Sequence, residues 1–155
     1  MKKVLASVLV LALVLGVCGM AFAGVKTKIG LITMDQMDVH WVRLRNAAQA
    51  RVDALNAEGN EITMVWLAPE TKDNQQQIEK IQSAVADGVN YIIIACNDGT
   101  SANRALQEAL DAGIKIIYVD APATLKASAT FATDNFAGGK QIGEYLAKLF
   151  AEKGV

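Results

Sequence analysis

Tyr91-Ile92-Ile93-Ile94-Ala95 is a continuous apolar run, without the alternation of apolar and polar residues that a half-exposed strand shows. A short run without alternation indicates a strand that is buried on both faces, as in a parallel sheet. Gly88 stands just before the run and ends an expected helix that begins after Asp73. A helix, a tight turn and a buried strand in this order are typical of an α/β fold.

The chain repeats this alternation of strand and helix on both sides of the run. Apolar stretches rich in β-formers predict further strands, and apolar residues at helical spacing predict the helices between them. The expected strands cover residues 28–34, 61–67, 91–95, 115–119 and 130–133, and the expected helices cover 41–58, 74–87, 101–112 and 136–153. We therefore predict an α/β three-layer sandwich with a parallel sheet in flavodoxin-like order and right-handed crossovers.

The first residues carry the pattern of a secretory signal peptide. Lys2 and Lys3 form a positive segment, residues 4–17 form an apolar run, and Ala21 and Ala23 stand where a signal peptidase requires small residues. This pattern predicts export with cleavage after Ala23. The apolar run is shorter than the roughly 20 residues of a membrane-spanning helix, which disfavours the alternative of a membrane anchor.

The two cysteines have different expected settings. Cys18 follows Val17, which occupies a place where a lipoprotein signal requires a very small residue, so a lipid anchor at Cys18 is the less favoured alternative. Cys96 would be the only cysteine left after cleavage, so no internal disulfide is expected. Because Cys96 ends an apolar run, we predict that it is a small buried residue rather than a reactive thiol.

Length and charge limit the class of protein. The chain has 155 residues, which is enough for one ordinary domain with a core but not for two. Once residues 1–23 are removed, acidic residues exceed basic ones by three, and no block of basic residues remains. This charge balance argues against nucleic acid as a partner.

Ligands of parallel sheets bind beyond the carboxyl ends of the strands, near the point where the strand order reverses. The loop after the first expected strand contains Asp35, Asp38, His40 and Trp41. Carboxylates bind sugar hydroxyls and a flat aromatic ring covers the apolar face of a sugar, so we predict that Asp38, His40 and Trp41 contact ligand. The alternatives are that either aspartate caps the next helix, that His40 is a surface or packing residue, and that Trp41 is the first core position of that helix.

Polar residues also follow the third and fourth expected strands. Asp98 and Ser101 are suited to cap the next helix, so Asn97 is the better candidate for ligand contact. Asp120 directly follows the fourth strand, and we predict that it binds ligand, with a cap or turn as the alternative. The predicted ligand-binding residues are therefore Asp38, His40, Trp41, Asn97 and Asp120.

No motif predicts catalysis, a metal or a cofactor. Gly139-Lys140 resembles the end of a phosphate-binding loop, but Asp134 stands where the first glycine belongs and Gln141 replaces the required Ser or Thr. One His and one cysteine after cleavage cannot form a standard zinc site, and no nucleophile–base pair is evident. We therefore expect a binding protein without a cofactor, and not an enzyme.

A series of short motifs resembles the type I periplasmic solute-binding proteins of ABC importers, the family of ribose- and galactose-binding proteins. The motifs are, in order, KIGLI at 28–32, DNQQQI at 73–78, ADGVNYIII at 86–94, AGI at 112–114, VD at 119–120, TDN at 133–135 and GG at 138–139. The resemblance covers essentially all of the chain after residue 23. It implies a periplasmic protein that binds a sugar or sugar-like solute in a cleft between two lobes and works with the membrane permease of an importer.

The resemblance also implies a domain organisation. Residues 1–23 would be the signal peptide, 24–133 the N-terminal solute-binding lobe, and 134–155 the crossover and first helix of a second lobe. Because the chain stops where that lobe should continue, we expect a truncated product whose last helix favours self-association. The lobe implied by the family supplies the loop after strand one, the loop after strand three and the acidic residue after strand four, which are the positions already named.

The identity of the solute and two other functions stay open. Ala121 stands where ribose binders commonly carry an arginine, so the sequence does not favour ribose itself. An exported free-standing flavodoxin-like domain would suit the fold, although no phosphate loop is present. The ligand domain of a sugar-sensing repressor would also suit it, but such proteins begin with a DNA-binding helix-turn-helix where this chain has a secretory signal.

Overall fold

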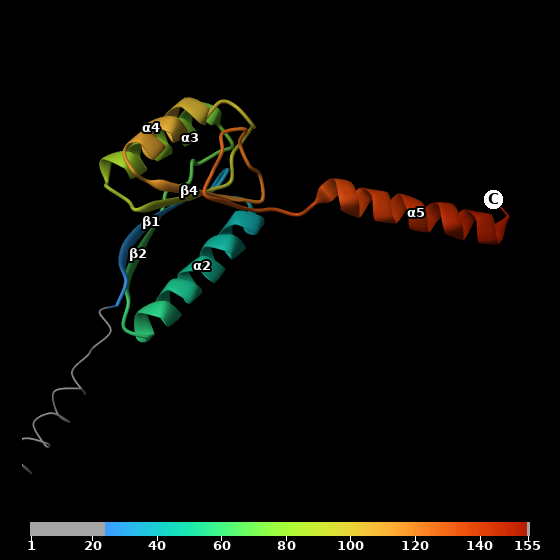
Figure 1. The fold of residues 1–155 in the computed structure, drawn as a ribbon, viewed down its shortest axis with the longest axis horizontal. Helices are drawn as coiled ribbons and strands as arrows, with labels where there is room; N and C mark the ends of the chain where they lie inside the picture. Colours follow the sequence, from blue (N-terminus) through green and yellow to red (C-terminus); the bar gives the residue numbers. More distant parts are fainter. Residues whose placement is uncertain (1–23, 155) are drawn as a thin grey trace, which may run out of the picture.

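The computed structural model describes residues 24–154, so the predicted signal peptide, its cleavage site and Cys18 lie outside the described residues. The described chain alternates strands and helices and ends in a helix that stands apart (Figure 1). The strands are β1 (Lys26–Ile32), β2 (Glu61–Trp66), β3 (Tyr91–Ile94), β4 (Lys115–Val119) and β5 (Ala129–Phe131), and the helices are α2 (Val39–Ala57), α3 (Asn74–Ala86), α4 (Asn103–Asp111) and α5 (Asn135–Lys153). None of these four helices has the length and apolar character needed to cross a membrane.

The strands form one parallel sheet with the order β2-β1-β3-β4-β5. The chain passes from β1 to its neighbour β2 and then crosses back to its other neighbour, β3. The switch point therefore lies between β1 and β3, where the loops that leave these two strands diverge. This topology confirms the predicted parallel sheet and its flavodoxin-like order.

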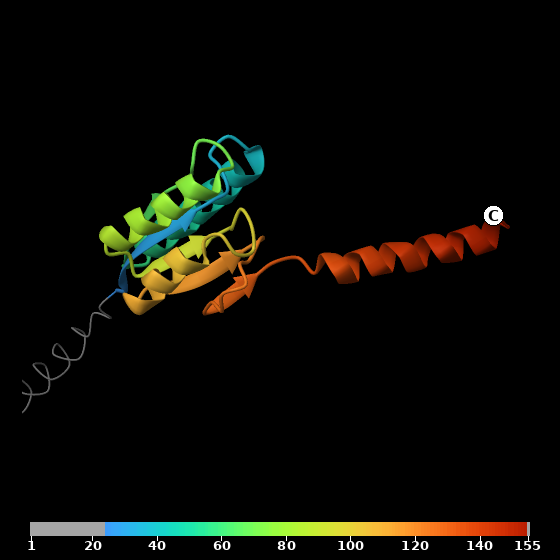
Figure 2. The same ribbon diagram turned by 90° about the horizontal axis from the view of Figure 1, so that it is seen from above.

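Helices cover both faces of the sheet, as predicted for a three-layer sandwich. The helices α3 and α4 pack side by side on one face, and α2 lies on the other (Figures 1 and 2). The α3–α4 face holds the main core, in which Ile92, Ile94, Ile116 and Tyr118 are at most 1% exposed. This face is sealed because two helices cover the strands on both sides of the switch point.

The α2 face is covered less completely, because α2 packs over β2. Successive side chains of a strand point to opposite faces, so Tyr91 and Ile93 of β3 and Ile117 of β4 point to the α2 side. All three are partly exposed. The prediction that the run 91–95 is buried on both faces is therefore wrong for the α2 side, where one helix cannot span the whole sheet.

The last helix, α5, leaves the layered body and runs away from it in both views (Figures 1 and 2). The carboxylate of Asp134 caps the helix by accepting a hydrogen bond from the backbone amide of Ala137 at 2.8 Å. None of its residues is buried, and Ile142 and Leu146 of the predicted apolar stripe are 63% and 40% exposed. The helix is therefore specified by its local sequence, and its stripe meets no partner among the described residues.

Candidate ligand-binding site

The loop after β1 is held by a chain of hydrogen bonds that begins on the neighbouring strand. The indole Nε1 of Trp66 donates to the hydroxyl of Thr33 at 2.9 Å, and this hydroxyl donates to the carbonyl oxygen of Asp35 at 2.9 Å. The carboxylate of Asp35 accepts hydrogen bonds from the backbone amides of Met37 and Asp38 at 2.8 and 2.7 Å. Thr33 is fully buried, so water does not compete for its bonds and the entry to α2 is fixed.

The three predicted residues at the start of α2 have different settings. Asp38 is the N-cap of α2, and its carboxylate accepts a hydrogen bond from the backbone amide of His40 at 2.8 Å. Trp41 is only 5% exposed, and its ring meets the imidazole of His40 edge-on at a centroid distance of 4.5 Å. The structure thus favours the capping alternative for Asp38 and the core alternative for Trp41, and it leaves His40 facing solvent.

Asn97, in the loop after β3, has a side chain that lacks partners. Its Oδ1 and Nδ2 atoms are both inaccessible to solvent and make no hydrogen bond to any described residue. The backbone amide of Asn97 donates to Oε1 of Gln77 at 2.9 Å, so the residue is anchored through its main chain. A buried polar group without a partner costs on the order of 1–3 kcal/mol, which a ligand or water that reached it would recover.

Asp98 is held by its own loop and by the start of α3. Its carboxylate accepts hydrogen bonds from the backbone amides of Ser101 and Thr100 and from the side chains of Ser101 and Asn74. The bonds from Ser101, followed by the bond from Thr100, hold the pKa of this carboxyl well below its usual range. The resulting turn delays the start of α4 to Asn103, two residues beyond the expected start at Ser101.

Two titratable groups beside this loop, Cys96 and Tyr118, are buried. Burial raises the pKa of the Cys96 thiol to about 11, although a backbone hydrogen bond from Ala123 acts in the opposite direction. Burial also raises the pKa of Tyr118 to about 12, and its hydroxyl donates to the carbonyl oxygen of Leu125 at 2.9 Å. A thiol that is neutral and 1% exposed is inert, as the sequence predicts for Cys96.

Asp120 occupies a strained position directly after β4. Its φ of 63° is the only positive φ of a non-glycine residue among residues 24–154. The backbone amide of Ala121 donates to the carbonyl oxygen of Val119 at 2.8 Å, which closes a tight three-residue turn around Asp120. The backbone amide of Asp120 donates to the carbonyl oxygen of Phe131 at 2.8 Å, so β5 holds the turn in place. Such strain persists where the surroundings enforce it, and it clusters at binding sites.

A hollow of about 270 Å³ brings two of the five predicted residues together at the carboxyl edge. His40 comes from the start of α2, and Asp120 comes from the turn after β4. The sequence did not single out Phe131, whose ring lines the same hollow and is 67% exposed at the end of β5. Leu44, Val119, Ala132 and Thr133 complete the lining, whereas Asp38, Trp41 and Asn97 do not line it.

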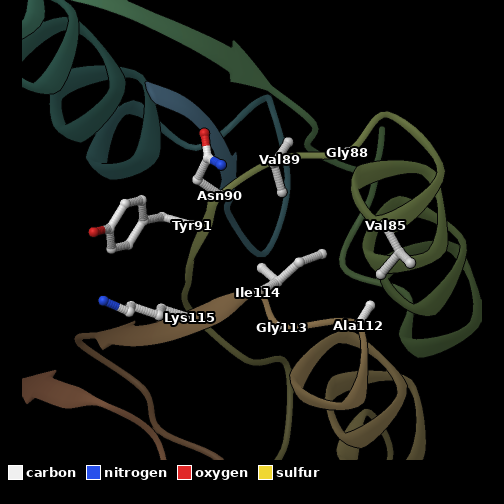
Figure 3. A pocket seen from close by; sticks show the side chains of 9 residues that line it. All are labelled: Val85, Gly88, Val89, Asn90, Tyr91, Ala112, Gly113, Ile114 and Lys115. Carbon is white, nitrogen blue, oxygen red and sulfur yellow. The ribbon is translucent and has the colours of Figure 1, made fainter. Parts of the chain in front are cut away.

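A larger hollow of about 440 Å³ lies at the opposite edge of the sheet, where β3 and β4 begin (Figure 3). Its lining comes mainly from the turns that end α3 and α4, around Gly88 and Gly113. The ammonium group of Lys115 lies 5.7 Å from the centre of the Tyr91 ring, so two of its polar side chains already interact. Ligands of parallel sheets bind at the carboxyl ends of the strands, so this hollow is less suited to a ligand than the smaller one despite its greater volume.

A three-layer α/β domain with polar and aromatic side chains at the carboxyl edge of a parallel sheet has the arrangement that is typical of small-molecule-binding domains. Among residues 24–154, no group of three His, Cys, Asp or Glu residues is arranged to hold a metal ion. The sequence profile of a family described as periplasmic binding protein domain matches residues 29–155. The chain belongs to this family, which confirms the resemblance, and proteins of this family bind solutes and are not enzymes.

The relatives carry sugar-binding names. The chain is 34% identical over 106 residues to the galactofuranose-binding protein YtfQ of Escherichia coli K12, which covers 66% of this chain and 33% of that protein. It is 28% identical over 163 residues to a D-ribose/D-allose-binding protein of Pseudomonas aeruginosa, covering 96% and 50%. A solved sugar transporter from Clostridium phytofermentans matches with a TM-score of 0.70 and 28% identity, over 81% of this chain and 46% of that one. The chain thus spans half or less of the length of the curated relatives that it matches.

The turn at Asp120 leads to a stability prediction. We expect Asp120→Ala to lower the free energy of unfolding by about 1 kcal/mol, because alanine adopts a φ of 63° at higher cost than aspartate. Asp120→Gly should stay within about 0.5 kcal/mol of the unaltered chain, because glycine adopts this φ freely. Urea denaturation measures both values, with Glu152→Ala on exposed α5 as the control. A loss of several kcal/mol in Asp120→Gly would contradict an exposed, strained turn.

Proposed function

We propose that this protein is the substrate-binding component of an ABC importer and that it holds a sugar or sugar-like solute at the carboxyl edge of its sheet. The observation that carries the proposal is the hollow in which His40, Asp120 and Phe131 meet. All three side chains are exposed, and none of them has a role in the core. The names of the relatives, which are those of sugar-binding proteins, support the class of solute.

The chemistry of the hollow matches the surface of a sugar. A carboxylate such as that of Asp120 accepts hydrogen bonds from two neighbouring hydroxyl groups, and an imidazole such as that of His40 donates or accepts one more. The ring of Phe131 offers a flat apolar surface for the C–H face of a sugar. Phe131 thus takes the role that the sequence predicts for Trp41.

The other predicted residues act beside or behind this hollow in our proposal. Asp38 caps α2 and Trp41 packs against the imidazole, so both set the position of His40. Asn97, in the loop after β3, has a buried side-chain amide without a partner. We propose that this side chain hydrogen-bonds to the ligand once the residues that cover it move. Residues 24–133 form the solute-binding lobe, and α5 lies beyond the crossover that follows β5.

The proposed binding leads to a prediction for residues 24–155 in solution. Only one side of a sugar is contacted in an open hollow, and hydroxyls that stay in water gain little net free energy. We expect D-ribose, D-allose and D-galactose to bind with dissociation constants of about 1 mM or weaker. Chemical shifts of backbone amides, followed up to about 100 mM sugar, should change around His40, Asp120 and Phe131 in the hollow and around Asn97 in the loop after β3.

Matched variants test whether this hollow is the site. His40→Ala and Asp120→Asn should each remove most of the shift changes, while Lys115→Ala at the opposite edge should leave them unchanged. Shift changes that cluster around Gly88 and Lys115 instead would place the site in the larger hollow. Binding at micromolar affinity by a monodisperse monomer would contradict the expectation of a weak, one-sided site.

Export is the second prediction of the proposed function, since a binding component of an importer works in the periplasm. The small residues Ala21 and Ala23 support cleavage after Ala23. When the full chain is expressed in a Gram-negative host, the periplasmic product should begin at Gly24, as N-terminal sequencing would show. A product that begins at a lipid-modified Cys18 would mean that the protein is a lipoprotein.

The exposed stripe of α5 supports a proposal of self-association. Ile142, Tyr145, Leu146 and Phe150 are between 40% and 65% exposed, and an apolar helix face of this kind drives association in water. We expect light scattering of residues 24–155 to show species larger than a monomer. The variant with Ile142→Glu and Leu146→Glu should shift the distribution to the monomer, whereas Glu144→Gln on the same helix should not. A monomeric unaltered chain would contradict this proposal.

A further inference from the structure

Gln77 is a buried polar residue at a structurally critical place. It lies in the first turn of α3 and is 2% exposed, and among residues 24–154 only Thr33 is another polar residue of this burial class. A polar side chain is rarely placed in a core unless its hydrogen bonds are satisfied there, because burying it unpaired is costly. The partners of Gln77 therefore show what it does.

The side-chain amide of Gln77 joins the two strands at the switch point. Its Nε2 donates to the carbonyl oxygen of Ala95 at 2.9 Å and lies 3.5 Å from the carbonyl oxygen of Thr33. Its Oε1 accepts a hydrogen bond from the backbone amide of Asn97 at 2.9 Å. These partners are the residues that leave β1 and β3, where the parting strands no longer satisfy each other's backbone groups.

The first turn of α3 also holds the far end of the same loop. Asn74, three residues before Gln77 and therefore on the same side of the helix, donates to the carboxylate of Asp98 and to the hydroxyl of Ser101. The inner contact through Gln77 is buried, whereas the outer contact through Asn74 is exposed. Asn97, whose side-chain amide is unpaired, lies in the loop between these two contacts.

We propose that Gln77 is a positioning residue of the ligand-binding site, which fixes the main chain of the loop 95–98 and thereby the place of the Asn97 side chain. This inference rests on the proposed function, in which Asn97 contributes to the solute site. The amide of Gln77 is suited to the task because it supplies donors to carbonyl oxygens and an acceptor to an amide at the same time. A purely apolar residue of the same size would fill the space but hold no backbone group.

The substitution Gln77→Glu tests this role because its effect depends on pH. A protonated glutamic acid has one donor and one acceptor, so it can keep the bonds to Ala95 and Asn97. An ionised glutamate has no donor, and its charge faces the Ala95 carbonyl oxygen. Burial raises the pKa of such a carboxyl above its unfolded value of about 4.3, so the loop is held at low pH and released as the pH rises through the folded pKa. Gln77→Leu removes both bonds at every pH.

Other titratable groups lie near the substituted position. They are Asp35 in the loop after β1, Cys96 and Asp98 in the loop after β3, and Asp73 at the start of α3. The exposed Gln75 is on the same turn, and Gln75→Glu adds the same charge there without burying it. Comparing the two variants at each pH therefore separates the effect of a buried charge at position 77 from that of an added charge on the same turn of α3.

The thiol of Cys96 reports opening of the loop directly, because it is buried between the two anchored residues. In a Cys18→Ala background, Cys96 is the only thiol of the chain. Its rate of reaction with a dithiodipyridine reagent would be measured for Gln77→Glu, Gln77→Leu and Gln75→Glu at about pH 5 and about pH 8, with thermal unfolding followed in parallel. D-Ribose titrations of the same proteins, monitored by amide shifts, report the ligand site.

At the higher pH we expect the Cys96 thiol to react on the order of tenfold to a hundredfold faster in Gln77→Glu than in Gln75→Glu. At the lower pH the two rates should be similar. Gln77→Leu should label fast at both, and the sugar-induced shift of Asn97 should weaken in parallel with labelling. Equal labelling of Gln77→Glu and Gln75→Glu at both pH values would overturn the proposal. Fast labelling of Gln77→Glu at both would also overturn it, since the protonated form would then fail to rescue the loop.

If Gln77→Glu unfolds at the higher pH, hydrogen exchange of the unaltered chain tests instead whether Gln77 holds the loop 95–98. The backbone amide of Asn97 should exchange as slowly as the backbone amide of Ala95, which donates to the carbonyl oxygen of Ile32 within the sheet. Exchange of the Asn97 amide at the rate of an exposed loop amide would overturn the proposal. If the unaltered chain shows no sugar-induced shifts at all, the proposed function fails, while labelling and exchange still decide whether Gln77 positions the loop.

Discussion

The parallel pairing of β1 with β3 is the constraint on which the rest of the structure depends. The pairing sets Ile29–Ile32 beside Tyr91–Ile94 in the middle of the sheet. The buried side chains of these segments contribute roughly 1.5–3 kcal/mol each, so the register cannot slip without exposing them. Because the chain leaves β1 for α2 on one face and leaves β3 for α4 on the other, the strand ends must part. The loops after β1 and β3 begin at this opening, where backbone groups lose their ladder partners.

Side chains from neighbouring elements satisfy those backbone groups, and they do so with different consequences. The buried Thr33 hydroxyl, backed by Trp66, fixes the loop toward α2, while Gln77 fixes the loop after β3. Both devices work in a dry setting, where a hydrogen bond is strong and an unpaired group is costly. The side chain of Asn97 receives no such partner among the described residues. Main-chain order next to an unpaired side-chain amide is the arrangement that a preorganised recognition group requires.

The sequence predicts the fold well because its signals are local and repeated. The run at 91–95 and the glycines that close each helix determine a parallel sheet without reference to distant residues. The site was harder to predict because side-chain direction depends on tertiary packing. Trp41 looks equally suited to a sugar face and to the core, and only the path of α2 decides between them. The importance of Phe131 depends on β5 lying beside β4, and that of Gln77 depends on the parting of β1 from β3, so a linear pattern reveals neither.

The two faces of the sheet are covered to different extents. On the α3–α4 side, Ile92, Ile94 and Ile116 are completely buried, and little can change there without a loss of packing. On the α2 side, the register that pairs Val119 with Phe131 directs both side chains toward the partly open half of the sheet, next to the start of α2. A single helix on that side cannot cover five strands, so surface is left over at β4 and β5. The incomplete cover lowers the apolar area that this face can bury, and it leaves open the hollow that Asp120 lines. The packing of the sealed α3–α4 face also supplies the free energy that keeps Asp120 in its strained turn.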